Sequence, residues 1–80
     1  MKTETEWADD VKRLLRAEMT RRGVSYDHLA GKLAAIGVQD SSVNIRNKVA
    51  RGRFSATFLF QCLSAMGAKS LRLVDDTDGE

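Results

Sequence analysis

The chain has 80 residues, of which 42% are hydrophobic and 30% are charged, a composition typical of one globular domain that excludes wholesale disorder. Its core must be small, because a chain of this length buries only about 60–65% of its unfolded surface on folding. Proline is absent, and the abundance of Ala, Leu, Lys, Arg and Glu favours helices over strands.

Charge is distributed unevenly along the chain, although the net charge is only +2. Between Val11 and Val74 there are 12 Lys and Arg against three Asp and Glu, whereas nearly all other carboxylates lie close to the two ends. A basic body with acidic ends indicates a domain that binds a polyanion. A scatter of solvated surface cations gives the same counts, and the sequence leaves that alternative open.

The residues that could support catalysis are few. Cys62 and His28 are the only residues of their kinds, so the sequence offers no disulfide pair, no metal-ligand cluster and no nucleophile with a matching base. We therefore expect no enzymatic activity, no cofactor, no metal and no small-molecule substrate. The spacing places Cys62 in the core as a small hydrophobe, and His28 on the surface.

The sequence also indicates where the protein is found. Its first ten residues lack the apolar segment of a signal peptide, and no apolar run approaches the length of a membrane span. We therefore expect a cytoplasmic protein with no membrane partner.

The first predicted helix covers residues 6–22 and ends at Gly23, after a flexible N-terminus at residues 1–5. Its stripe at helical spacing contains one polar residue, Glu18, and Trp7 is expected to pack the start of the helix onto the core. The members of the stripe are Trp7, Val11, Leu14, Leu15, Glu18 and Met19.

Two shorter helices are predicted next. Ser25 is the expected N-cap of the second, which ends before Gly37. Asp40 or Ser41 is the expected N-cap of the third, which ends at Gly52. Within the third helix Ile45 and Val49 lie four residues apart and should face inward. The opposite, outward face is predicted to carry Asn44, Asn47, Lys48 and Arg51, with Arg46 on its flank.

A fourth helix, strongly apolar, is predicted between an N-cap at Ser55 and Gly67, where it should form the centre of the core. Phe60 lies off its main stripe, and belongs either to a wider core or, with Leu71, to a dimer interface. The alternation at residues 70–74 suits a short strand, while its length suits a helical turn, and both stay open. Residues 75–80 are predicted to form a disordered acidic tail.

The expected fold is all-α, a four- to five-helix bundle of helix-turn-helix type spanning residues 6–74. The order of features resembles the phage-repressor class, the Xre or Cro/C1 type, over residues 11–67, on the motifs Ser25-Tyr26-Asp27-His28-Leu29-Ala30, Leu33 and Arg51-Gly52. Two features depart from that class: residues 34–36 lengthen the turn, and Tyr26 stands where the class often has a glutamine that grips the DNA backbone.

The chain resembles still more closely a small bacterial family of unknown function. The shared pattern lies around Val24-Ser25-Tyr26, residues 44–52 and Gln61-Cys62-Leu63. That resemblance implies a fold and no established activity, so the functional prediction depends on the chemistry of the third helix.

The predicted function is non-enzymatic binding of double-stranded DNA by a small transcriptional regulator that places helix 41–51 in the major groove. Amide side chains can read adenine, and cations can read guanine or hold phosphate. Base contacts are expected from Asn44, Asn47, Lys48 and Arg51. Phosphate contacts are expected from Arg46, Arg53, Tyr26, Lys32, Arg21 and Arg22. For so small a domain we expect tight binding to require a homodimer.

The alternative is a protein-interaction or adaptor module, antitoxin-like or self-associating. In that interpretation the apolar patch near Phe60 binds the partner, and the basic face is ordinary solvated helix surface.

Overall fold

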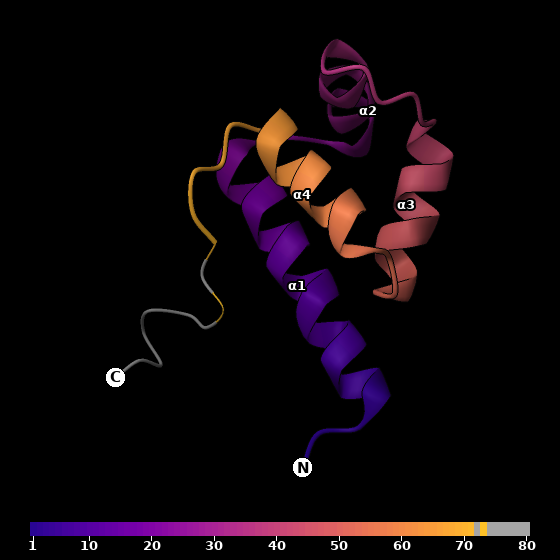
Figure 1. Cartoon of the computed structure of the whole chain (residues 1–80), viewed down its shortest axis with the longest axis vertical. Helices are drawn as coiled ribbons and strands as arrows, with labels where there is room; N and C mark the ends of the chain where they lie inside the picture. Colours follow the sequence, from indigo (N-terminus) through magenta and orange to yellow (C-terminus); the bar gives the residue numbers. More distant parts are fainter. Residues whose placement is uncertain (72, 74–80) are drawn as a thin grey trace.

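The computed structural model describes residues 1–71 and 73, and all regular structure in that part of the chain is helical. The helices are α1 (Glu4–Arg22), α2 (Tyr26–Ala35), α3 (Ser42–Arg51) and α4 (Ala56–Ala65). Figure 1 shows α4 lying across the long α1, with α2 at one end of this pair and α3 on one edge. The prediction of an all-α bundle is confirmed, with four helices in the described residues.

The C-terminal predictions are only partly covered by the structure. Ser70 and Leu71 form neither a strand nor a helix, and Leu73 lies in a bend. The rest of segment 70–74, and the acidic tail expected at 75–80, lie outside the described residues. Among the helices that are described, none combines the length and the apolar character needed to cross a membrane.

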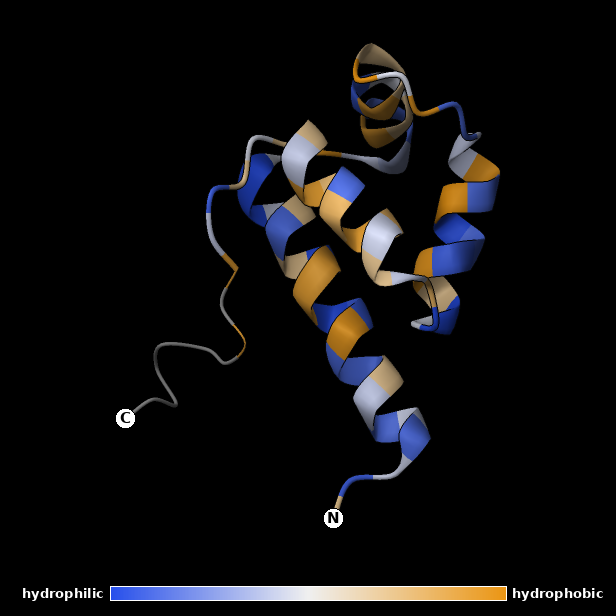
Figure 2. Cartoon of the chain, viewed as in Figure 1, coloured by the Kyte–Doolittle hydropathy of each residue, from blue (hydrophilic) through white to orange (hydrophobic). Residues whose placement is uncertain are grey.

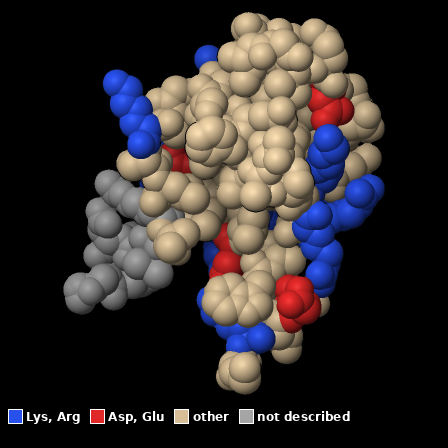
Figure 3. Space-filling view, in the orientation of Figure 1, with Lys and Arg blue, Asp and Glu red and all other residues tan. Residues whose placement is uncertain are grey.

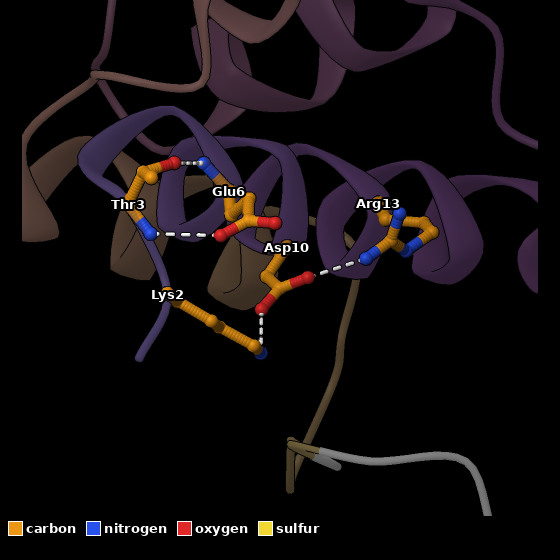
Figure 4. A network of polar contacts seen from close by, with 5 residues as sticks. All are labelled: Lys2, Thr3, Glu6, Asp10 and Arg13. Atoms are coloured by element: carbon orange, nitrogen blue, oxygen red, sulfur yellow. Dashed lines mark hydrogen bonds and ion pairs between the residues drawn. The ribbon is translucent and has the colours of Figure 1, made fainter.

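The first helix begins at Glu4, two residues earlier than expected, because Thr3 and Glu6 form a capping box (Figure 4). The Thr3 hydroxyl accepts a hydrogen bond from the Glu6 backbone N–H at 3.1 Å, and the Glu6 carboxylate accepts one from the Thr3 N–H at 2.8 Å. Two ion pairs, from Lys2 and from Arg13, converge on Asp10 beside this box. The segment 1–5, expected to be flexible, therefore contains the cap and the first two residues of α1.

The other N-caps are confirmed as Ser25, Ser41 and Ser55, whose side chains each accept the backbone N–H three residues later. For α3 this decides between the two candidates in favour of Ser41. Each cap satisfies one of the N–H groups that the first turn of a helix leaves without a partner.

The core forms where the four helices meet. Its fully buried side chains come from every helix and are Leu15, Leu29, Leu33, Ile45, Val49 and Cys62. The inward placement predicted for Ile45, Val49 and Cys62 is therefore confirmed. In Figure 2 the hydrophobic colour predominates along α4, whereas blue residues interrupt it repeatedly on α1 and α3. The helix without charged residues is thus α4, as its sequence predicts.

The expected packing of Trp7 onto the core is wrong. The Trp7 side chain is 55% exposed, with the Lys2 ammonium 4.6 Å from the centre of its ring, and the neighbouring Ala8 is buried instead. The reason is a close approach of two backbones: a Cβ atom built on Gly52 would lie 2.2 Å from the Ala8 carbonyl oxygen. At this crossing of α1 and the end of α3 there is room only for small residues.

Glu18, the polar member of the α1 stripe, is buried, with only 2% of its surface exposed. Its carboxylate accepts a hydrogen bond from Arg21 at 2.8 Å and a second from Arg22. A buried carboxylate is tolerated when it is paired and hydrogen-bonded in this way. Both arginines are consequently drawn toward the bundle at the end of α1.

Candidate nucleic-acid interface

Helix α3 lies on the edge of the bundle, where Ile45 and Val49 anchor one side of it in the core. Its other side is exposed and carries Asn44, Asn47 and Arg51, together with Val43, which is 57% exposed. No acidic residue occurs from Ser41 to Arg53. An exposed surface that bears amides and cations is therefore available along the whole helix.

Lys48 lies at the margin of this outward face: its side chain is 43% exposed, but its ammonium is turned toward a carboxylate. Its ammonium lies 2.6 Å from the Asp40 carboxylate and 4.6 Å from the centre of the Phe58 ring, on the flank that faces α4. The hydrogen bond from Lys48 holds the pKa of Asp40 below its ordinary value, against partial burial, which raises it. Lys48 thus links α3 to the start of α4, and a new anion would have to compete with Asp40 for it.

Ion pairing separates the cations of the described residues into two groups. Carboxylates hold Lys2, Lys12, Arg13, Arg21, Arg22, Lys48 and Arg53. Within residues 1–71, no ion pair is formed by Arg16, Lys32, Arg46, Arg51 or Lys69. A cation whose charge is already neutralised attracts a phosphate less strongly, so the second group is the better source of contacts with a polyanion.

Arg46 and Arg16, both in the second group, meet at Tyr26. Arg46 stacks on the Tyr26 ring, with its guanidinium carbon 5.4 Å from the ring centre. Arg16 donates a hydrogen bond from Nε to the Tyr26 hydroxyl at 3.4 Å. Arg16 was not among the predicted contact residues, because only the tertiary structure, in which α1 packs against α3 and Arg16 reaches Tyr26 at the start of α2, brings it to this site.

In the face that Figure 3 shows, Lys and Arg side chains gather along the edge formed by α3, and the broad surface over α4 is free of charge. Carboxylates also reach this edge at two places, since Asp40 pairs with Lys48, and Glu4 approaches Arg53 at 3.7 Å. The exposed part of the edge between these two pairs contains Asn47 and Arg51.

A family model described as a domain of unknown function, DUF6471, matches residues 7–71, which is most of the chain. The chain belongs to the DUF6471 family. The match begins at Trp7 and ends at Leu71, so it takes in nearly all of α1 and the whole of α2, α3 and α4. No curated protein and no solved structure matches the chain. Membership of a family of unknown function agrees with the sequence analysis, and the resemblance to phage repressors stays a prediction.

The other residues predicted to contact phosphate in the DUF6471 domain differ in their exposure and in whether a carboxylate already pairs with them. Arg21 and Arg22 are occupied by Glu18 at the end of α1. Lys32 is exposed on α2, and Tyr26 is half-buried at its start. The structure therefore brings Tyr26 and Arg46 together, and keeps Arg21 and Arg22 in contact with a carboxylate.

The two residues predicted for a dimer interface, Phe60 and Leu71, differ in how far they are exposed to solvent in the DUF6471 domain. Phe60 is 73% exposed, which excludes the wider core that was one of its two interpretations. Leu71 is half-buried and packs against the core. An apolar surface around Phe60 alone thus stays available to a partner.

Proposed function

We propose that this DUF6471 domain binds duplex DNA through the exposed face of α3, as a small helix-turn-helix regulator that catalyses no reaction. The observation that supports this most strongly is the exposure of Arg46 and Arg51 beside Asn44 and Asn47, with no carboxylate paired to either arginine among the described residues. Such a surface lacks its counter-charge, and a polyanion supplies it.

The shape of α3 suits the major groove. The helix has 10 residues, which corresponds to a length of about 15 Å, and the groove is about 12 Å wide and admits one α-helix. Asn44 and Asn47 offer the donor and acceptor pair that matches adenine, and Arg51 offers the donors that match guanine. We assign base contacts to these three residues, and a smaller role to Lys48, because Asp40 already holds its ammonium.

The phosphate contacts follow from the ion pairs. Arg46 and Lys32 form no ion pair with a carboxylate in the part of the chain that the structure describes, and Tyr26 offers a hydroxyl near Arg46. The contribution to DNA affinity is lower for an arginine that must first break an ion pair with a carboxylate, as Arg21, Arg22 and Arg53 must. We therefore expect Arg46 to contribute more to affinity than any of these three.

The charge reversal Arg51→Glu is expected to weaken binding of a random-sequence duplex by roughly 10-fold or more at low salt, because it replaces an attraction by a repulsion at the groove. Fluorescence anisotropy at low and at moderate salt measures the affinity. The matched control is Lys69→Glu, which changes the net charge equally. Lys69 is also exposed and without an ion pair in the described residues, but follows α4 on the side of the molecule away from α3 (Figure 1).

Two results would contradict this assignment. One is the absence of any duplex binding by the parent domain at low salt. The other is an equal loss in the two variants, since this would mean that only the overall charge matters and that α3 has no special part.

A protein-interaction module is the second candidate, and the exposure of Phe60 favours it. An apolar ring on a helix without charged residues is a typical anchor for a partner. We expect Phe60→Asp to leave duplex affinity within about twofold of the parent, because α4 lies outside the proposed DNA surface. A loss of duplex binding comparable to that of Arg51→Glu would instead mean that DNA binding depends on association through α4.

A further inference from the structure

An open groove of about 400 Å³ lies between the second half of α1, the start of α2 and one side of α3. Met19 and Val24 contribute apolar surface to it, and Thr20, Ser25 and Asp27 contribute smaller polar groups. Its three largest polar side chains are those of Arg16, Tyr26 and Arg46. These three polar residues come from three different helices, and lie 10 and 20 positions apart in the sequence. The groove is therefore a product of the tertiary structure.

The tyrosine holds both arginines in place without neutralising either. Its hydroxyl oxygen accepts the Arg16 Nε–H at 3.4 Å, and its ring lies under the Arg46 guanidinium at 5.4 Å. Because the Tyr26 oxygen acts here as an acceptor, its own proton stays available for donation to a further group. These three side chains thus offer two guanidinium groups and one hydroxyl donor to the groove.

The charge around the groove is unbalanced. Asp27 is the one carboxylate among its lining residues, and it forms no ion pair with Arg16 or Arg46 within the described part of the chain. Two cations face one carboxylate at a site open to solvent, whereas Arg13, Arg21, Arg22 and Arg53 each have a carboxylate in contact. An anion is the group that this arrangement lacks.

We propose that Arg16 and Arg46 together hold one phosphate of a nucleic-acid backbone in this groove, with the Tyr26 hydroxyl as a third donor. The planar guanidinium group matches phosphate oxygens in pairs, and charge-assisted hydrogen bonds of this kind are the strong ones. The proposal rests on the proposed DNA-binding function and extends it, since it adds Arg16 to the phosphate contacts and assigns Arg16, Tyr26 and Arg46 to one phosphate.

The phosphate in this groove would set the position of α3 on the duplex. Arg46 belongs to α3, so a phosphate fixed at Tyr26 fixes the helix relative to the backbone, which is how phosphate contacts determine register. A free phosphate offers the same chemistry. The place of Arg46 on α3, the helix proposed to enter the major groove, favours the backbone of a duplex, and the experiment separates the two.

The test compares Arg16→Gln and Arg46→Gln with Lys69→Gln, which removes an exposed cation far from the groove. Each groove variant is expected to weaken duplex binding by about 3- to 10-fold, and to flatten the slope of log affinity against log salt by part of the roughly 0.9 that one phosphate contact contributes, while the double variant should lose the whole of it. Lys69→Gln should leave both quantities near those of the parent. Because the Arg16 and Arg46 side chains are exposed, the variants Arg16→Gln and Arg46→Gln should unfold at the same temperature as the parent domain.

A milder variant probes the tyrosine. Tyr26→Phe keeps the ring under Arg46 and removes only the hydroxyl, so we expect roughly a twofold loss of affinity with the salt slope unchanged. A slope that fell as much as in Arg16→Gln would contradict the assigned role of Tyr26, since no charge has been removed.

The outcomes separate this proposal from the proposed function. If the parent binds duplex and Arg51→Gln weakens it, while Arg16→Gln and Arg46→Gln keep the parent affinity and slope, only the groove assignment is overturned. If the parent does not bind duplex, both fall. In an NMR titration, shifts of the Tyr26 amide with inorganic phosphate but not with duplex would overturn the backbone assignment in favour of a free phosphate.

Discussion

Replacing Gly52 by alanine is expected to lower the free energy of unfolding by about 3 kcal/mol, the sum of two separate costs. The backbone at Gly52 is left-handed, with φ +66°, which costs a residue with a side chain roughly 1–2 kcal/mol. The added Cβ would also lie 2.2 Å from the oxygen and 2.8 Å from the carbon of the Ala8 carbonyl. These are backbone atoms of α1, so no rotation of a side chain can relieve the contact, and the helices must separate.

Gly23→Ala is the matched control for this change. Gly23 has nearly the same backbone conformation, φ +65°, and nothing within 4 Å of an added Cβ, so it should show the conformational cost alone. Urea unfolding of both variants measures the difference, which is the contribution of the contact between α1 and α3. Equal losses would mean that the close approach of Ala8 and Gly52 is relieved at no cost. Since a domain of this size is stable by only about 4–12 kcal/mol, the loss in Gly52→Ala should be large in proportion.

The Cys62 thiol is expected to react about a thousandfold more slowly with a thiol reagent in the folded domain than in the unfolded chain, near pH 8. Burial raises the pKa of Cys62 from 9.0 to about 12, despite the nearby positive charge of Lys48, which lowers it. Only the thiolate reacts, and at pH 8 a rise of three units in the pKa reduces the thiolate fraction about a thousandfold. The side chain is also fully buried, which adds a barrier of access.

Absorbance after addition of an aromatic disulfide reagent measures this rate with and without urea. A folded-state rate close to that of the unfolded chain would show that the thiol is open to solvent, against the full burial of Cys62 in the core. Reaction that accelerates in Gly52→Ala in proportion to its unfolded fraction would be consistent with buried Cys62, since the thiol would then react only after unfolding.

The same shift predicts how stability depends on pH. Because the folded state keeps the Cys62 proton that the unfolded chain loses above pH 9, the contribution of this group is fully present below pH 9 and is lost as the pH rises toward 12. The expected slope is at most about 1.4 kcal/mol per pH unit. Cys62→Ala removes this titration and none of the others, so the free energy of unfolding of this variant should fall less steeply between pH 9 and 12 than that of the parent. Parallel curves of the free energy of unfolding against pH for the parent and Cys62→Ala would contradict the raised pKa of Cys62.

Local signals in the sequence determined the helices and most of the core. Ser25, Ser41 and Ser55 each lie just before an apolar pattern of helical period, and a cap depends only on the next three residues. The start of α1 could have been predicted by the same reasoning, since the capping box from Thr3 to Glu6 is visible in the sequence. Ile45, Val49 and Cys62 were predicted correctly because the period of a helix assigns its inward face.

Only the tertiary structure decided which cations remain available and which small residues allow the helices to meet. The contact of Lys48 with Asp40, the contact of Ala8 with Gly52 and the meeting of Arg16 with Arg46 at Tyr26 join residues eight or more positions apart. Such contacts depend on how helices cross, and a helical period is the same whichever neighbour a face meets. The sequence could thus locate the basic helix, but packing determined which of its charges are already neutralised.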